Sequence, residues 1–329
     1  MTTRRDVLHA GGGALLQPLA AWAQPVGPVR RIGVLSPGAA ATEAASPWRA
    51  VFFEMLQRAG FEPGRNLAVE VRYAEGQVER LPELAQELVQ LKVELIAAVQ
   101  NDAVAAARHA TRSVPIVMLF GTEPVELGFV DSLARPGGNV TGTVWISSEI
   151  AGKDLEVLKD ALPRATRVAT LANPAAPGIE RYSAEAKRAA SALGITLLGF
   201  AAVRPQEIAP ALERIAASAP DALYVVTDSV IETRLSEIAA FALAHKLPTL
   251  GTGIRLVEAG GLLYYGADIR EILARSVSYI DRILRGAKPA DLPVETPTRF
   301  ELVVNMKTAK ALGITLPPSI LVRASRVIE

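Results

Sequence analysis

The stretch from Arg31 to Gly38 reads RIGVLSPG, and its first half is a short apolar run of the kind that forms a buried strand. Downstream, Ser46 and Pro47 supply an N-cap and a first-turn proline for a helix. One face of that helix carries Trp48, Val51, Phe52, Met55 and Leu56. A buried strand followed by an amphipathic helix indicates the first βα unit of an α/β fold.

The same alternation of strand and helix continues along the chain. Further strands are expected at residues 67–73, 95–99, 116–120, 140–145, 168–172, 196–200, 222–226, 247–251, 262–265 and 300–304. Residues 67–73 alternate apolar and polar side chains, which predicts a strand near a sheet edge. Helices separate the strands, and one of them is expected to be capped by Ser148. This order predicts parallel sheets with right-handed crossovers.

Two successive series of strands and helices predict an α/β fold with two doubly wound, Rossmann-like lobes. We assign residues 31–145 and 267–296 to the N-terminal lobe and residues 146–266 and 297–329 to the C-terminal lobe. The chain would then cross between the lobes several times and form a hinge. A hinge between α/β lobes predicts a ligand cleft that opens and closes.

The first 23 residues have the composition of a secretory signal peptide. Arg4 and Arg5 form a charged start, residues 10–20 are apolar, and residues 21–23 are an A-x-A cleavage site. The apolar run is too short to span a bilayer, and Pro18 interrupts it. Export by a twin-arginine-like or a Sec route is expected, with a periplasmic mature chain that starts at Gln24 and is not inserted in the membrane. Residues 24–30 are interpreted as a linker.

The composition narrows the class of protein. Half of the residues are hydrophobic, so a large core is available, and cysteine is absent. The chain has 35 basic and 34 acidic residues, and removal of residues 1–23 makes the two kinds equal in number. A balanced charge gives no electrostatic reason to expect nucleic acid as a partner.

Sequence motifs for catalysis and cofactors are missing. The chain contains no G-x-S-x-G, H-E-x-x-H, Walker A or G-x-G-x-x-G pattern. His109 and His245 each fall in the last turn of an expected helix, where the helix dipole favours them. We therefore expect no metal site, no cofactor and no enzymatic activity, although isolated carboxylates leave an enzyme open.

Ligands of parallel α/β sheets bind beyond the carboxyl ends of the strands. Polar side chains follow most of those ends here, and Tyr265 ends a strand of the second lobe. The candidate ligand-binding residues are Ser36, Gln100, Asn101, Thr122, Glu123, Asn173, Thr227, Asp228, Thr252 and Tyr265. The same residue types are ordinary helix caps, so both roles remain open.

The two acidic candidates favour a particular ligand chemistry. Glu123 and Asp228 follow strands of opposite lobes, and a buried carboxylate needs a cationic partner. Both could face an ammonium group, while helix N-termini after Gln100 and Asn173 could hold a carboxylate. This arrangement would suit an amino-acid-like or other polar solute.

Several motifs resemble one known family. They include SLARPGGNVTG at residues 132–142, VEAGG at 257–261, GAKPADLPVE at 286–295 and NMKTAKALG at 305–313. From residue 31 to the end, the chain resembles the substrate-binding proteins of ABC transporters of the tryptophan/tyrosine-binding type. The resemblance implies a type I periplasmic-binding fold with three chain crossings, and transport rather than catalysis.

This chain departs from the family pattern in the expected cleft. It has Gln100-Asn101-Asp102 where many relatives have Gly-Thr-Pro, and Glu123 where they have Asp. Thr227-Asp228-Ser229 stands where Pro-Asp-Pro is common. The resemblance therefore implies the fold more strongly than it implies an aromatic amino acid as ligand.

The leading hypothesis is a monomeric periplasmic protein that captures a small molecule and delivers it to an ABC transporter permease. A sensory binding module with the same fold is the alternative, since a periplasmic receptor could also be its partner. A periplasmic enzyme is the third class.

Overall fold

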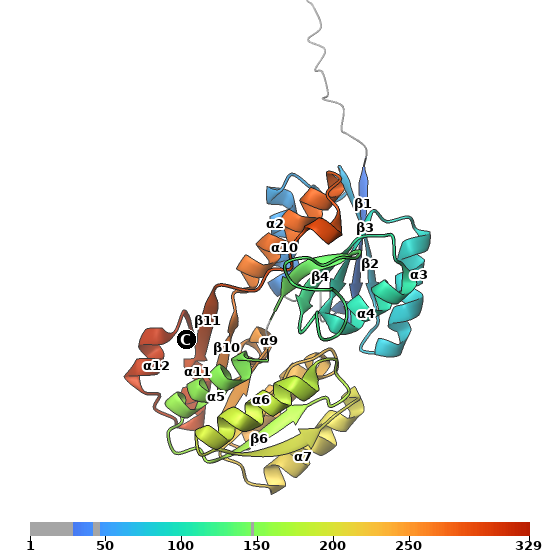
Figure 1. Ribbon diagram of the computed structural model, residues 1–329. Helices are drawn as coiled ribbons and strands as arrows, with labels where there is room; N and C mark the ends of the chain where they lie inside the picture. The colour runs from blue at the N-terminus through green and yellow to red at the C-terminus, as the bar shows by residue number, and fades with distance from the viewer. Residues whose placement is uncertain (1–28, 42–46, 146–147) are drawn as a thin grey trace, which may run out of the picture.

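The computed structural model describes residues 29–41, 47–145 and 148–329, which form two α/β lobes (Figure 1). The first lobe has a parallel five-stranded sheet in the order β2-β1-β3-β4-β5. Its strands are β1 (Arg30–Ser36), β2 (Leu67–Tyr73), β3 (Leu95–Val99), β4 (Ile116–Gly121) and β5 (Val140–Val144). Its helices include α2 (Pro47–Arg58), α3 (Leu81–Gln90) and α4 (Gln100–Ala110).

The second lobe has seven strands in the order β12-β11-β10-β9-β8-β6-β7. The strands are β6 (Arg167–Ala172), β7 (Thr196–Ala201), β8 (Ala222–Val225), β9 (Thr249–Gly251), β10 (Leu263–Ala267), β11 (Phe300–Asn305) and β12 (Arg326–Ile328). The helices are α5 (Ile150–Ala161), α6 (Ile179–Ala192), α7 (Ile208–Ala217), α8 (Leu235–Ala244), α9 (Ile254–Glu258), α11 (Met306–Leu312) and α12 (Pro318–Arg323). Only the β10–β11 pair is antiparallel among the described pairings.

The two sheets share one topology. The order β7-β6-β8-β9-β10 in the second lobe repeats the order β2-β1-β3-β4-β5 of the first. Each is the doubly wound order in which the first strand lies inside the sheet and ligands bind at the carboxyl ends of the strands. This confirms the predicted fold class of two doubly wound lobes.

Helix α10 (Ile269–Leu284) follows a strand of the second lobe in sequence and packs on the first lobe. Its Leu273, Val277 and Ile280 belong to the same buried cluster as α2 and β1. The chain then returns past Glu295, which pairs with Thr143 of β5, into β11. Three segments therefore join the lobes, at residues 145–148, 267–269 and 295–300.

The expected local structure is largely present. Strand β2 lies at a sheet edge as predicted, and α2 begins at Pro47, while its expected cap Ser46 lies outside the described residues. The prediction that Ser148 caps α5 is wrong, because its backbone carbonyl, and not its side chain, accepts the hydrogen bond from the Ala151 amide. The strand β12 was not predicted, since its three residues are too few to show a pattern.

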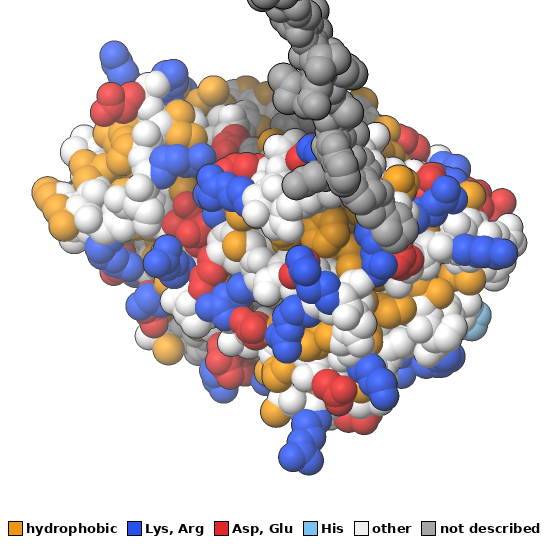
Figure 2. All heavy atoms as spheres, turned by 90° about the horizontal axis from the view of Figure 1, so that it is seen from above, with side chains coloured by type: hydrophobic (Ala, Val, Ile, Leu, Met, Phe, Trp, Pro, Cys, Tyr) orange, Lys and Arg blue, Asp and Glu red, His pale blue; other side chains and the backbone are white. Residues whose placement is uncertain are grey.

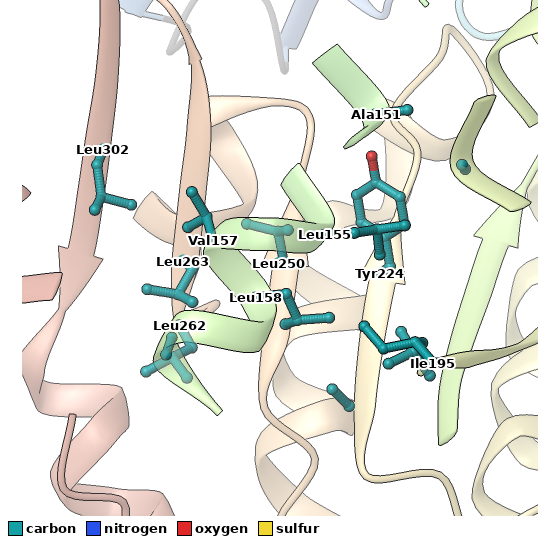
Figure 3. Close-up of a cluster of buried hydrophobic side chains, with 14 of the residues drawn as sticks. Ala151, Leu155, Val157, Leu158, Ile195, Tyr224, Leu250, Leu262, Leu263 and Leu302 are labelled. Atoms are coloured by element: carbon teal, nitrogen blue, oxygen red, sulfur yellow. The ribbon is translucent and has the colours of Figure 1, made fainter. Parts of the chain in front are cut away.

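The core of the second lobe has two main parts, one between its sheet and helices α5 and α6 and the other between the sheet and helices α7 and α8. Leu155 and Leu158 of α5 pack over Tyr224 and Leu250 of the sheet, as Figure 3 shows. Among the described residues, no helix is long and apolar enough to cross a bilayer. On the face seen in Figure 2, basic and acidic side chains are interspersed, with no large area of one sign.

Candidate functional site

A cavity of about 160 Å³ lies between the lobes, at the carboxyl ends of the strands. Each lobe contributes the loops that follow its strands, so polar side chains from both lobes face one space. Eight of the ten predicted residues line it: Gln100, Asn101, Thr122, Glu123, Asn173, Thr227, Asp228 and Thr252. Their positions follow from the parallel topology, because the ends of neighbouring parallel strands meet at one edge of a sheet.

The other two predicted residues do not line the cavity. Ser36 is fully buried at the end of β1, where its Oγ accepts a hydrogen bond from the Gly38 amide. Tyr265 stacks on Phe300 of the neighbouring strand, with ring centroids 6.0 Å apart. Ser36 and Tyr265 thus lie outside the lining of this cavity, and their role as ligand contacts stays a prediction.

Asp228 belongs to a network of hydrogen bonds in the second lobe. Its Oδ1 accepts from the backbone N–H of Ile231 at 2.9 Å, and its Oδ2 accepts from Asn173 Nδ2 at 2.7 Å. Asn173 Oδ1 in turn accepts from the Ala175 amide. Asp228 thus lines the cavity and also binds the backbone of the turn that follows β8. Burial raises the pKa of Asp228 to about 6.

Glu123 has a different environment in the first lobe. Its Oε1 accepts from the Ser148 amide at 2.7 Å, and its Oε2 lies 3.3 Å from the Arg181 guanidinium of α6. Arg181 also pairs with Glu126. The cationic partner expected for Glu123 is therefore supplied by the protein, across the cleft.

Asp102 is a site residue that our sequence reasoning did not select. It lines the cavity from the first turn of α4, and its Oδ2 accepts a hydrogen bond from Ser229 Oγ of the other lobe at 2.7 Å. Burial raises its pKa above the ordinary value. The sequence did mark this position, since Asp102 belongs to the Gln100-Asn101-Asp102 segment that departs from the family pattern.

Other direct contacts also connect the lobes. Asn101 Nδ2 donates to Thr122 Oγ1 and to the carbonyl of Pro177 in the second lobe. Gln100 Nε2 donates to Glu232 Oε2 at 2.9 Å. These bonds hold the two walls of the cavity close together.

An aromatic wall was also missed. Trp48, Phe120 and Trp145 line the cavity and contact one another edge to face, with ring centroids 5.8 and 5.2 Å apart. The pattern had assigned Trp48 to the helix core and Trp145 to the hinge, and it gave no sign that the three rings meet. Aromatic side chains offer flat apolar area and attract cations to their faces.

Three cavity-lining side chains have a buried polar atom without a hydrogen-bond partner among the described residues. These atoms are Gln100 Oε1, Ser148 Oγ and Thr227 Oγ1. An unpartnered buried polar group costs about 1 to 3 kcal/mol. Groups of this kind in a cavity are available to bind a ligand.

Backbone strain is concentrated in the same place. Gln100, Phe120 and Glu123 have φ values of 64°, 58° and 47°, which are unfavourable for residues other than glycine. Such conformations cost on the order of 1 to 3 kcal/mol each and are typical of ligand sites. The strain turns these side chains toward the cavity at the ends of β3 and β4.

A buried hydrogen-bonded cluster supports one wall. Tyr182 lines the cavity, and its hydroxyl donates to Asp154 Oδ2 at 2.8 Å. Tyr224 also donates to Asp154 Oδ2, at 2.6 Å. Asp154 is fully buried, and this burial raises its pKa to about 7. The cluster fixes the position of the Tyr182 ring.

The described residues contain no group of three or more side chains suited to hold a metal ion. The polar side chains and the aromatic wall of the cavity suit recognition of a small molecule by hydrogen bonds, charge and aromatic contact.

The comparisons with known proteins agree with this geometry. The family model described as ABC transporter substrate binding protein matches residues 43–328. A curated relative, the tyrosine-binding protein of Clostridioides difficile (strain R20291), is 28% identical over 264 residues, which are 80% of this chain and 75% of that protein.

Two solved structures are similar over 91% of this chain and 99% of theirs. One is an ABC domain from Streptococcus pneumonia in complex with L-Trp, with a TM-score of 0.82 and 27% identity. The other is a ligand-free, open structure of a substrate-binding protein with adhesive properties from Clostridium difficile, with a TM-score of 0.65 and 26% identity.

The resemblance seen in the sequence motifs is thus confirmed over nearly the whole described chain. Since the family model matches residues 43–328 and the fold has two type I periplasmic-binding lobes, this chain belongs to the ABC transporter substrate-binding protein family.

Proposed function

We propose that this protein captures a small polar, amino-acid-like solute in the cavity between its lobes and delivers it to an ABC importer from the periplasm. The observation that carries the proposal is the convergence of polar side chains from both lobes on one cavity with an aromatic wall. Gln100, Ser148 and Thr227 each hold a buried polar atom available for a solute there. In this role the protein binds its solute without chemical conversion and acts as a monomer.

The arrangement of the lobes supports capture by closure. The TM-score is higher to the L-Trp complex than to the ligand-free, open structure, at nearly equal identity and coverage. Hydrogen bonds across the cleft, such as that from Ser229 to Asp102, fit a closed form. Closure around a solute is the usual response of two hinged lobes.

A thermal-shift screen of amino acids, amines and sugars tests the solute-binding role. The protein is first unfolded and refolded to remove any solute that it carries. A solute at a hundred times its Kd stabilises the fold by about 2.7 kcal/mol, and therefore raises the Tm by several degrees. A protein with no response to any solute, but with turnover of one, would favour a periplasmic enzyme instead.

Export is tested at the N-terminus. Mass spectrometry of the periplasmic fraction should find a mature chain that begins at Gln24. Replacing Arg4 and Arg5 by lysine should stop a twin-arginine route and leave a Sec route active. An uncleaved chain in the membrane fraction would contradict the signal-peptide interpretation.

The importer and the sensory alternative differ in their partner. Uptake of the identified solute should be lost when the gene is deleted, and pull-down should recover a permease. Normal uptake together with recovery of a sensor protein would favour the sensory binding module.

A further inference from the structure

The charges that line the cavity are unequal. Four carboxylic acids face it, namely Asp102, Glu123, Asp228 and Glu232, and Arg255 is the one cation among the described lining residues. The two internal stretches that the structure does not describe, residues 42–46 and 146–147, contain no lysine or arginine in the sequence. A solute in this cavity therefore meets an excess of negative charge.

Two of the four acids are already neutralised by the protein. Glu123 pairs with Arg181, and Glu232 pairs with Arg255 at 3.2 Å. Arg255 is thereby engaged, which leaves no described cation in the lining to receive a carboxylate of the solute.

The remaining two acids, Asp102 and Asp228, lie on opposite walls. Ser229, which directly follows Asp228, bonds Asp102 across the cleft at 2.7 Å, and the charge of Asp102 raises the pKa of Asp228 further. In the described part of the chain neither carboxylate has an ion pair. Two uncompensated carboxylates brought together by closure repel each other while both are ionised, and a cation between or beside them relieves that repulsion and keeps both charged.

Independent features also indicate a ligand at this cavity. Ser148 is 2% exposed and its Oγ, on the cavity wall, has no hydrogen-bond partner among the described residues. Thr227, next to Asp228, has a buried and unpartnered Oγ1. The aromatic wall of Trp48, Phe120 and Trp145 offers apolar contact and ring faces to the body of an organic cation.

The first turn of α4 disfavours an anion. Helix N-termini often bind carboxylates, and the helix after Gln100 was a candidate for this. Asp102 places a negative charge in that first turn. A solute carboxylate at this helix would approach Asp102 directly.

We propose that Asp102 and Asp228 together bind the positive group of the solute, and that the solute is an organic ammonium ion with an apolar body and no free carboxylate. This inference rests on the proposed capture of a small polar solute and specifies its chemistry: the solute keeps the ammonium group of an amino acid and lacks the carboxylate. Asp102 is the specificity-determining residue, because it adds the second carboxylate on the opposite lobe.

Calorimetry with matched pairs of probes tests the inference. The pairs are phenethylamine and L-phenylalanine, tyramine and L-tyrosine, tryptamine and L-tryptophan, and isoamylamine and L-leucine, so that the members of each pair differ by the carboxylate. The refolded mature protein should bind at least one amine tenfold or more tightly than the amino acid of the same pair. In Asp102→Asn the affinity for that amine should fall about tenfold and the preference within the pair should shrink.

Asp160→Asn is the matched control, because Asp160 pairs with Arg323 on the outside of the second lobe. The Asp160→Asn variant should keep the preference of the unmodified protein for the amine over the amino acid of the same pair. Tighter binding of the amino acids would overturn the inference and leave the proposed function standing. Binding of neither series would also overturn it, while the wider solute screen decides the proposed function. A preference that survives Asp102→Asn would overturn the role of Asp102.

Discussion

The two acidic sides of the cleft differ in how their charge is compensated. On one side, Glu123 receives the Ser148 amide and the Arg181 guanidinium. On the other, Asp228 receives the neutral donors Asn173 and Ile231, with Asp102 as its charged neighbour. Two carboxylates that follow strand ends of opposite lobes thus have opposite requirements for a ligand. The charge of Glu123 is compensated within the protein, whereas compensation of the charge of Asp228 requires a bound cation.

The largest effect is expected from Asp228→Asn. This change keeps the shape and removes the charge, so the affinity for an amine should fall by about 1 to 3 kcal/mol, the range for a lost charged hydrogen bond. Glu123→Gln should cost less, because Glu123 already has a cationic partner. Calorimetry on both variants with the best amine provides the measurement. Equal losses of affinity in the two variants would mean that Glu123 and Asp228 do not differ in their contribution to binding.

The pH dependence of binding should show the same difference. The pKa of Asp228 is raised to about 6 by burial and by Asp102, with Asn173 and the Ile231 amide as its hydrogen-bond donors. A cation requires the ionised form, so affinity should be constant well above pH 6 and fall as pH decreases below it, by up to about tenfold per unit. Titration by calorimetry between pH 4.5 and 8 would measure this. The fall should be smaller in Asp228→Asn, and an unchanged profile would contradict the assignment.

Arg181→Gln is expected to have a moderate effect on closure. It removes ion pairs from α6 to Glu123 and Glu126 across the cleft, and Arg181 is 46% exposed, so solvent screening should limit the loss of stability of the closed form. Small-angle scattering of the ligand-free protein should give a larger radius of gyration for the variant. Arg188→Gln, on the same helix and paired within it to Glu185, should leave the radius unchanged. Equal radii for all three proteins would mean that the Arg181 pairs do not hold the lobes together.

The smallest effect is expected from Ser148→Ala on the Glu123 side. Its Oγ has no hydrogen-bond partner among the described residues, so the ligand-free Tm should stay the same or rise slightly. Affinity should fall only a few-fold if the hydroxyl contacts the solute. Thr143→Ala is a useful contrast, because Thr143 Oγ1 bonds Ser276 Oγ at 2.9 Å and its loss should lower the Tm. A large drop in Tm for Ser148→Ala would indicate a structural role.

Most of the fold could be predicted because the apolar patterns of its strands and helices are local and recur along the chain. The apolar run at Ile32 and the helical face of Trp48 and Phe52 follow from the periods of strand and helix. Short or partner-dependent elements could not be predicted in the same way. Strand β12 depends on pairing with β11, and the conformation of Ser148 depends on Glu123 from another strand end.

The location of the candidate site could be predicted from the sequence, but the hydrogen bonds and ion pairs of its residues could not. Strand ends such as Gln100 and Thr227 were chosen because parallel topology brings them together. Ser36 and Tyr265 satisfied the same rule, yet local packing engages them elsewhere. The position of a residue at a strand end does not predict whether its side chain turns toward the cleft, because this orientation depends on contacts with residues distant in sequence.

By itself, the sequence determined the two doubly wound lobes, the strand ends that meet at the cleft, and the family motifs, because these depend on local periodicity and short-range order. Only the tertiary structure decided that Arg181 neutralises Glu123, that Asp102 and Asp228 have no ion pair within the described part of the chain, and that Trp48, Phe120 and Trp145 form one wall. The physical reason is that charge compensation and ring contact depend on distances between side chains of different elements and lobes. Residue spacing along the chain does not fix those distances.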